Sequence, residues 1–424
     1  MKILSVILDL EKGGAQRAAQ NFALGYKHLG HDSRVLYTRH SNETVNHRGK
    51  ILRKNKIKLY SLNNNQHRKL LKRWKPNLVH LHAHGITKNN FACIKKIIPH
   101  ATYVETNVFS TLSGWSEEIL YSFQLSHWSQ WLYYLRGGKN DKNICLPYPV
   151  HTKSFSRASK DKILKFRSHY NIPHNAFVIG RVGQSIPTKW SYTIISLFNS
   201  IACTKKNVYL VLINTSKDII RLAKKSRYSQ RIIIINSIYG DDNLSIAYSS
   251  FNVVYLAADQ GESFGMVIPE AILCGTPVIS LATPWGDNSQ CEVTRNKVGG
   301  YVINNYKNGI SIINKMIGTK NINNFVLKKG IKHIIKNYDY INVSKQVVNL
   351  LKLKKNNTYN NNLQNINVVK ILKNAFDKPN FFTVILLKLK LRFLTRYSSG
   401  YDNWINFFRR VYIKIYKIFD LKKT

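Results

Sequence analysis

Apolar and polar positions alternate along most of the chain in the way that is typical of parallel α/β proteins. Short apolar runs, which predict buried strands, are followed by segments whose apolar residues recur every three or four positions, which predict helices. Lys2–Leu8 is the first such run, and Ala18, Phe22 and Tyr26 then repeat at helical spacing before Gly30, a residue typical of helix ends. The order strand, glycine loop and helix predicts the opening of a doubly wound domain.

Two series of these units predict two domains. In the first series the further apolar runs are Val35–Thr38, Leu78–Leu81 and Thr102–Glu105. The second series follows a helical pattern at Lys160–Tyr170, and its predicted strands are Phe177–Val182, Val208–Ile213, Arg231–Asn236, Val253–Ala257, Pro277–Leu281 and Gly300–Ile303. The 424 residues also exceed what a single core usually holds. We expect Rossmann-like domains over residues 1–150 and 151–355.

The last part of the chain has a different composition. An asparagine-rich stretch, NNTYNNNLQNIN, is typical of a linker, and a basic, aromatic segment follows it. On a helix, the apolar residues of 400–424 would share one face, with most lysines and arginines elsewhere. Such a helix suits an anionic membrane surface, and docking on the protein's own core is the alternative. Residues 356–424 are therefore predicted to be a linker and a basic amphipathic tail.

Charge narrows the classes of partner. Lysine and arginine number 65 against 21 aspartates and glutamates, a formal net charge of +44 that attracts nucleic acid, anionic lipid and phosphorylated small molecules. No nucleic-acid recognition motif accompanies the charge, so no specific nucleic acid is expected. The 5 cysteines lack metal-ligand spacing and are typical of reduced cytoplasmic thiols. Neither a signal peptide nor an apolar run long enough for a membrane span is apparent.

The segment Gly261–Gly275, GESFGMVIPEAILCG, carries the strongest chemical signal. It follows the predicted strand Val253–Ala257, and ligands of open α/β sheets bind at the carboxyl ends of strands. Because proline is tolerated only in the first turn of a helix, Pro269 predicts a helix that begins near Gly265 or Met266. The free N–H groups at such a helix start favour a phosphate.

Two glutamates in this segment could hold different parts of one elongated ligand. Glu262 lies on the predicted loop and Glu270 one turn into the helix, although both could simply be solvated carboxylates. Their spacing within GESFG, before EA and CG-PV, resembles family 4 retaining glycosyltransferases of the GT-B fold. The resemblance implies two Rossmann-like domains that face a central cleft. It places Glu262 at the donor sugar, Glu270 at the ribose hydroxyls, and the intervening residues at the diphosphate, namely Ser263, Phe264, Gly265 and Met266.

Two cations complete the predicted donor site. Arg181 ends the first predicted strand of the second domain, and Lys189 follows it closely. Both could converge on a diphosphate and stabilise the charge of a departing nucleoside diphosphate. They resemble the family's GR…K element, with a longer intervening stretch, and the alternative is that they are ordinary members of a large basic set. The predicted catalytic residues are Glu262, Arg181 and Lys189.

The first predicted domain carries weaker signals. Gly13–Arg17, GGAQR, resembles the family's GGA-R loop, which would bring Gly14 to the donor and Arg17 to the acceptor or sugar. The loop lacks the full GxGxxG pattern, so NAD binding is not expected. Alternate histidines in Val79–Gly85 are similar to the family's H-x-H element. They could be satisfied structural residues, metal ligands, or, for His84, a substrate contact. The resemblance implies no metal ion, because GT-B enzymes usually work without one.

Departures from the family pattern concern the acceptor side. Asn107 stands where many relatives carry a histidine, and an amide can only hydrogen-bond a sugar or acceptor. Cys145–Phe155 resembles the interdomain hinge, with Tyr148 and His151 in place of two usual residues.

The resemblance implies a retaining glycosyltransferase that moves a hexosyl unit from a nucleoside diphosphate sugar to a glycan or lipid-linked acceptor. Bacterial surface polysaccharide synthesis, as of lipopolysaccharide or capsule, is the expected setting. No cofactor is expected besides the donor substrate, and the protein would be cytoplasmic and peripheral on the inner face of the membrane. The alternatives are a nucleotide-sugar epimerase or phosphorylase on the same fold and, from another class, a basic nucleic-acid-binding protein.

Overall fold

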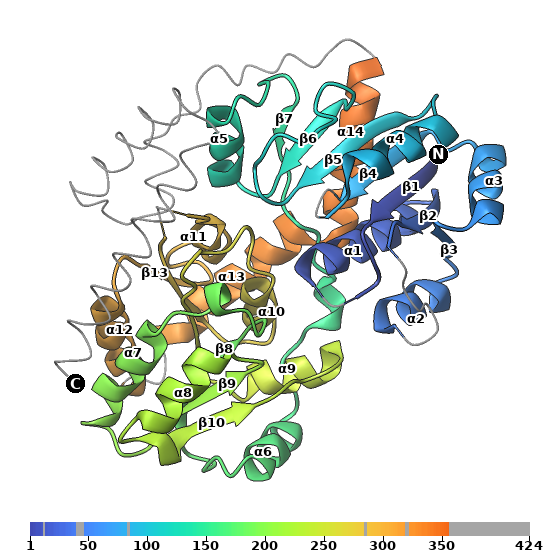
Figure 1. Cartoon of the computed structure of the whole chain (residues 1–424). Helices are drawn as coiled ribbons and strands as arrows, with labels where there is room; N and C mark the ends of the chain where they lie inside the picture. Colours follow the sequence, from blue (N-terminus) through green and yellow to red (C-terminus); the bar gives the residue numbers. More distant parts are fainter. Residues whose placement is uncertain (12, 40–45, 83–84, 284–285, 319–321, 356–424) are drawn as a thin grey trace. The chain divides into compact units, whose positions relative to one another are not determined.

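The computed structural model describes residues 1–355 apart from residues 12, 40–45, 83–84, 284–285 and 319–321 (Figure 1). Contacts divide this part of the chain into two compact units. The first contains Met1–Ser154, Ser263–Pro269 and the helical segment from Lys332, and the second contains Phe155–Glu262 and Glu270–Ile331. Each unit is built on one parallel sheet. The predicted tail, residues 356–424, lies outside the described residues.

The first sheet has 7 strands in the order β3-β2-β1-β4-β5-β6-β7. Strand β1 pairs with both β2 and β4, so the carboxyl ends of β1 and β4 flank the point where ligands bind in sheets of this kind. The strands are β1 (Lys2–Ile7), β2 (Asp32–Tyr37), β3 (Lys58–Ser61), β4 (Leu78–His82), β5 (Thr102–Asn107), β6 (Tyr121–Gln124) and β7 (Asn143–Cys145), and the helices of this part of the chain are α1 (Gly14–His28), α2 (His47–Lys54), α3 (Asn65–Trp74), α4 (Lys88–Ile97) and α5 (His127–Leu135).

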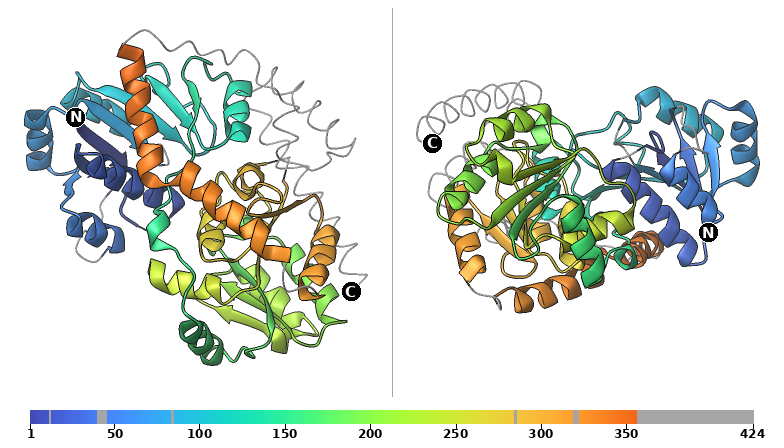
Figure 2. Two further views of the ribbon diagram at one scale, coloured as in Figure 1. Left: turned by 180° about the vertical axis from the view of Figure 1, so that it is seen from behind. Right: turned by 90° about the horizontal axis from the view of Figure 1, so that it is seen from below.

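Helices cover both faces of this sheet, which explains why every residue of β1 after Lys2 is buried. Ile3 packs on one face with Phe22 of α1, while Leu4 packs on the other with Phe91 of α4. The face of Ile3 is also covered by Val343 and neighbouring residues of α14 (Tyr340–Lys355), the last described helix, which Figure 2 shows from behind.

Helix α14 crosses α1 closely. A Cβ atom on Gly25 would lie 2.6 Å from the carbonyl oxygen of Tyr340 and 2.2 Å from Oγ of Ser344, so only glycine permits the approach. The apolar pattern predicted that everything up to residue 355 belongs to the second domain. The contacts instead group the chain from Lys332 with the first unit, because the apolar face of α14 completes the core on the first sheet.

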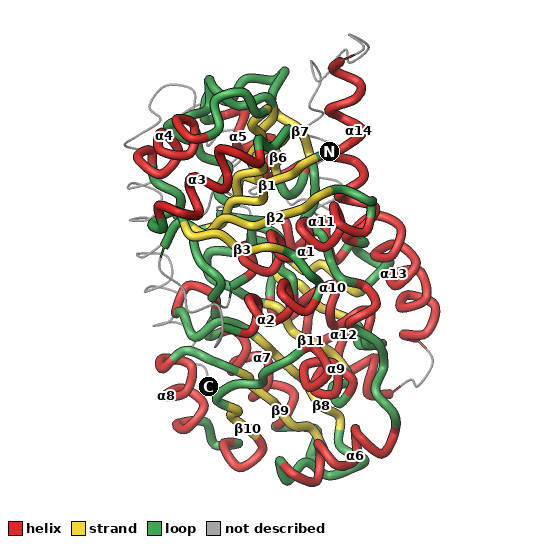
Figure 3. The backbone as a smooth tube through the Cα atoms, turned by 90° about the vertical axis from the view of Figure 1, so that its right-hand side faces the viewer, coloured by secondary structure: helices red, strands yellow, loops and turns green. Residues whose placement is uncertain are grey.

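The second sheet has 6 strands in the order β10-β9-β8-β11-β12-β13, with helices on both faces (Figure 3). Each of the ten predicted strand runs matches an observed strand. The ends agree to within two residues, with one exception: β2 begins at Asp32 and not at Val35. The strands here are β8 (Phe177–Val182), β9 (Val208–Ile213), β10 (Ile232–Ile235), β11 (Val253–Leu256), β12 (Val278–Leu281) and β13 (Gly300–Ile303), and the helices from α6 onward are α6 (Lys160–His169), α7 (Thr193–Ala202), α8 (Lys217–Lys225), α9 (Asp241–Ser249), α10 (Val267–Leu273), α11 (Ser289–Thr294), α12 (Tyr306–Gly318) and α13 (Ile322–Tyr338).

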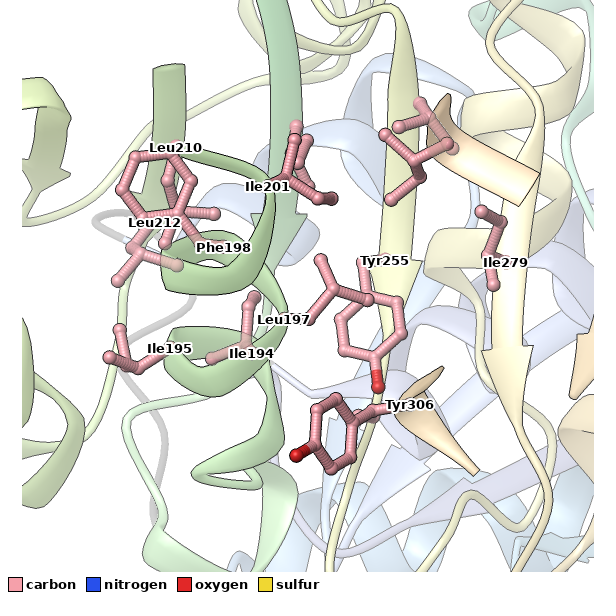
Figure 4. Packing of buried hydrophobic residues seen from close by; sticks show 14 of the residues in the cluster. Ile194, Ile195, Leu197, Phe198, Ile201, Leu210, Leu212, Tyr255, Ile279 and Tyr306 are labelled. Atoms are coloured by element: carbon pink, nitrogen blue, oxygen red, sulfur yellow. The ribbon is translucent and has the colours of Figure 1, made fainter. Parts of the chain in front are cut away.

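The core of the second unit lies between its sheet and α7. Leu197 and Phe198 of α7, both fully buried, pack with Leu210 of β9 and Tyr255 of β11 (Figure 4). Tyr255 is a central residue of the strand whose carboxyl end leads into GESFG. This packing fixes β11 and therefore the start of the loop that follows it.

Candidate active site

The loop after β11 is held in place by its own backbone and by the segment after β12. Gly261 has φ of +71°, and a Cβ there would lie 1.7 Å from the carbonyl oxygen of Asp287, so the position requires glycine. The N–H of Glu262 donates to Oε1 of Gln290 at 3.0 Å, and its carbonyl oxygen accepts from the N–H of Ser289 at 3.1 Å. These contacts fix the backbone from which the Glu262 side chain projects.

Glu262, Lys189 and Arg181 form an ion-paired cluster within the second unit. Lys189 Nζ lies 2.7 Å from Oε2 of Glu262, and an Arg181 terminal nitrogen lies 3.6 Å from Oε1. The Arg181 side chain is only 1% exposed, against 24% for Lys189 and 13% for Glu262. The sequence predicted that the two cations converge on a diphosphate; in the structure both lie beside Glu262, and their contact with a diphosphate stays a prediction.

Arg181 owes its orientation to backbone carbonyl groups. Its guanidinium donates to the carbonyl oxygen of Val182 at 2.7 Å and to that of Lys189 at 2.9 Å, while its Nε is buried and has no hydrogen-bond partner among the described residues. Burial lowers the pKa of Arg181, and the neighbouring Glu262 opposes that effect. The arginine therefore presents a charge whose position is set before any ligand arrives.

Glu270 is also buried, at 2% exposure, and accepts a hydrogen bond from the hydroxyl of Tyr248 at 2.9 Å. The suggestion that Glu262 and Glu270 are merely solvated carboxylates is therefore wrong. Helix α10 begins at Val267, slightly later than predicted, because Gly265 has φ of +83° and interrupts the helical backbone. Pro269 lies in the first turn, as the sequence predicted.

The segment between the two glutamates belongs to the first unit. Ser263 and Phe264 are buried, and a Cβ on Gly14 would lie 3.9 Å from Cγ of Met266. The structure thus brings Gly14, at the start of α1, beside the residues predicted to hold the donor phosphates. Gly265 lies between Phe264 and Met266 in the sequence and therefore belongs to the same segment.

The glycine loop after β1 depends on Asp9, which sequence reasoning missed. Asp9 is 1% exposed and accepts hydrogen bonds from Nε2 of Gln16 at 3.0 Å and from the N–H of Glu11 at 3.1 Å, and it also pairs with Arg39. The only signal was an acidic residue directly after the first apolar run. Arg17 lies half-buried in the first turn of α1.

The histidines of β4 are buried. His80 bonds the Tyr26 hydroxyl and Thr106 Oγ1, both at 2.8 Å, so it is a satisfied structural residue. His82 packs against His80 with ring centroids 4.4 Å apart and ring planes tilted by 35°, and burial lowers the pKa of His82 to about 3, which keeps it neutral. His84 lies outside the described residues. No group of three possible metal ligands is found in the part of the chain that the structure describes.

Asn107 holds the loop that follows β5. It is 3% exposed, and its Nδ2 donates to the carbonyl oxygen of Thr111 at 2.6 Å and to Oε1 of Glu105 at 3.3 Å. Glu105, which sequence reasoning also missed, accepts from Nε1 of Trp115 at 2.8 Å and from Oγ of Ser122 at 2.7 Å. A role for Asn107 at the acceptor stays a prediction.

Glu105 should make stability depend on pH. Burial raises its pKa above the ordinary 4.5, so between that value and the raised one the folded protein binds more protons than the unfolded chain. The free energy of unfolding therefore falls as pH rises through this window, and Glu105→Gln should remove the fall in denaturant titrations at several pH values. Glu117→Gln is the control, because Lys139 lowers the pKa of Glu117 and its effect has the opposite sign. Equal pH slopes for wild type and Glu105→Gln would contradict the assignment.

Comparison with known proteins identifies the class of fold. Residues 162–318 match the family model described as "Glycosyl transferases group 1". Anabaena Alr3699/HepE, solved in complex with UDP and glucose, is similar with a TM-score of 0.68 and 17% identity over 83% of this chain and 99% of its own. The lipopolysaccharide outer core galactosyltransferase WaaB, in its apo form, gives a TM-score of 0.59 and 16% identity over 84% and 100%. At these identities the likeness establishes the fold, which is GT-B, and confirms the predicted fold class.

A sequence relative is more limited in extent. The GtfA subunit of the UDP-N-acetylglucosamine–peptide N-acetylglucosaminyltransferase of Streptococcus agalactiae is 39% identical over 64 residues, which is 15% of this chain and 12% of that protein. Together the matches confirm the resemblance to GT-B glycosyltransferases. Membership of family 4 stays a prediction. Within the described residues no helix has the length and apolar character to cross a bilayer.

Proposed function

We propose that the protein is a retaining glycosyltransferase that transfers a hexosyl unit from a nucleoside diphosphate sugar to a glycan or lipid-linked acceptor. The observation that carries the proposal is the ion-paired cluster of Glu262, Lys189 and Arg181, followed eight positions along the chain by the buried Glu270. Solved structures of the same fold contain UDP with glucose, or UDP-glucose, which supports a uridine nucleotide as the first donor to test.

In the proposed reaction, the bond between the anomeric carbon and the diphosphate oxygen breaks. A bond from the acceptor hydroxyl oxygen to that carbon forms, and the hydroxyl proton is released. Arg181 and Lys189 stabilise the negative charge that the departing diphosphate gains. Glu262 contacts the donor sugar and Glu270 the ribose. We favour displacement from the same face as the leaving group, because no convincing nucleophile accounts for a covalent intermediate.

The setting that we propose is surface polysaccharide synthesis at the inner face of the cytoplasmic membrane. WaaB, which shares the fold, is an outer core galactosyltransferase of lipopolysaccharide, and this supports a related role for the present chain. Residues 400–424, whose sequence has the pattern of a basic amphipathic helix, would provide contact with anionic lipid. The proposed chemistry uses no cofactor, and the proposed acceptor contacts remain Arg17, His84 and Asn107.

A donor panel tests the proposal. Purified protein is incubated with UDP-, GDP- and ADP-sugars, and binding, nucleoside diphosphate release and the anomeric configuration of any product are measured. A glycosyltransferase releases nucleoside diphosphate and retains the configuration, whereas an epimerase changes the sugar without releasing the nucleotide. Failure to bind or turn over any donor would contradict the proposed function.

A further inference from the structure

Tyr148 lies in the segment of residues 146–154, which follows β7 and begins the connection to the second sheet, and this part of the connection is attached at several points within the first unit. Nδ2 of Asn21 donates to the carbonyl oxygen of Pro149 at 2.8 Å. The N–H of Val150 donates to the carbonyl oxygen of Tyr338 at 2.7 Å, and the N–H of Tyr340 donates back to Val150 at 2.9 Å. The connection is thus fixed both to α1 and to the junction of α13 and α14.

Two further contacts strengthen the same junction. Oγ1 of Thr152 donates to Oδ2 of Asp339 at 2.5 Å, and His151 stacks on Tyr340 with ring centroids 4.5 Å apart and planes within 14°. Tyr148 and His151 are the residues that depart from the family's hinge pattern. In this protein the ring of His151 packs against Tyr340 and the ring of Tyr148 against Phe264.

Phe264 of the GESFG segment packs against two tyrosines from this fixed frame. Its ring centroid is 5.5 Å from that of Tyr148 and 5.5 Å from that of Tyr338. All three rings are at most 9% exposed. Since Tyr148 and Tyr338 lie on segments joined by backbone hydrogen bonds, the frame determines where Phe264 can lie.

The structure uses the ring of Tyr148 rather than its hydroxyl. The hydroxyl oxygen is buried and has no hydrogen-bond partner among the described residues, and burial raises the pKa of Tyr148, so the phenol stays neutral. A buried hydroxyl without a partner destabilises the fold, and removing it leaves no donor or acceptor unsatisfied. The packing contribution of the ring can therefore be separated from any polar contribution by experiment.

We propose that Tyr148 is a positioning residue of the donor site: its ring holds Phe264 and thereby fixes Ser263–Pro269, the segment bounded by Glu262 and Glu270. The inference rests on the proposed function and extends it to a residue outside the ion-paired cluster. Glu262 is held separately by Gln290 and Ser289, so the middle of the segment depends most on the packing of Phe264. Loss of the ring should weaken nucleotide binding because site residues need placement to a fraction of an ångström.

The test compares UDP affinity, measured by isothermal titration calorimetry, in full-length variants. We expect Tyr148→Ala to raise the Kd for UDP about tenfold, and Tyr148→Phe, which keeps the ring, to retain the wild-type Kd and a melting temperature no lower than wild type. Tyr60→Ala is the matched control, since Tyr60 is a buried tyrosine of β3 that packs in a separate cluster. It should lower the melting temperature and leave the Kd unchanged.

Each outcome bears on one proposal. If Tyr148→Phe weakens UDP binding as much as Tyr148→Ala, the hydroxyl acts directly and the positioning role is wrong. Wild-type affinity in Tyr148→Ala would also overturn it. Should Tyr148→Ala fail to fold, Tyr338→Leu removes the opposite ring and must raise the Kd. By contrast, wild-type protein that binds none of UDP, GDP and ADP would contradict the proposed function itself.

Discussion

Replacing Lys189 with methionine should lower kcat for glycosyl transfer by about 10²- to 10³-fold, the usual effect of removing one group that stabilises charge in a transition state. The side chain is 24% exposed and lies 2.7 Å from Glu262, so its loss removes a cation from the leaving-group side without opening a core. Methionine keeps a similar length. The measurement is the steady-state rate of nucleoside diphosphate release with donor and acceptor present.

Lys225→Met is the matched control, because Lys225 is an exposed lysine of α8 in the same unit. It should leave kcat unchanged, and Lys189→Arg should restore part of the rate by restoring the charge. Arg181 is less suitable for this test, since its guanidinium also bonds two backbone carbonyl oxygens and its removal would disturb the local fold. A Lys189→Met enzyme with wild-type kcat would exclude the lysine from the catalytic group.

The second large effect is expected at Glu270. Glu270→Ala should weaken nucleotide binding by about 10- to 100-fold, because a charge-assisted hydrogen bond to ribose contributes roughly 1.5–3 kcal/mol. Calorimetry with UDP and with 2′-deoxy-UDP separates this role from general damage. Wild type should prefer UDP, and Glu270→Ala should lose that preference.

Tyr248→Phe provides a graded comparison. The hydroxyl of Tyr248 donates to the Glu270 carboxylate at 2.9 Å, so its loss should reduce the preference for UDP without abolishing it. A Glu270→Ala protein that still discriminates UDP from the 2′-deoxy nucleotide would show that the ribose is held elsewhere.

The sequence predicted the strands in which a run of apolar residues stands out and missed β3, β6 and β7, which have no such run. Strands β6 and β7 contain Ser122, Gln124 and Asn143, all fully buried, and their polar side chains interrupt the apolar pattern. Strand β3, at the edge of its sheet, is too short and too polar to register. The periodicity of apolar residues predicts where apolar side chains are buried. It does not predict where hydrogen-bonded polar side chains are buried.

The same distinction applies to the site. Glu262, Arg181 and Lys189 could be found because their spacing within local motifs brings them to neighbouring strand ends. Asp9, Glu105 and Tyr248 were missed because each acts through partners that are distant in sequence or lack any motif. The placement of Phe264 between Tyr148 and Tyr338 likewise depends on contacts between residues that are far apart in the sequence, and no local pattern predicts such contacts.

The packing of α14, the last described helix, on the first sheet has a consequence for the folding of the newly synthesised chain. The face of the first sheet that contains Ile3 and Val104 packs with Phe22 of α1 and is completed by Val343 and Val347 of α14. Domains generally fold as units while the ribosome is still adding residues. Here the half that is synthesised first must keep an apolar face open until α14 has left the ribosome, after the entire second sheet. The nascent chain therefore has a long interval in which that face is available to chaperones and to aggregation.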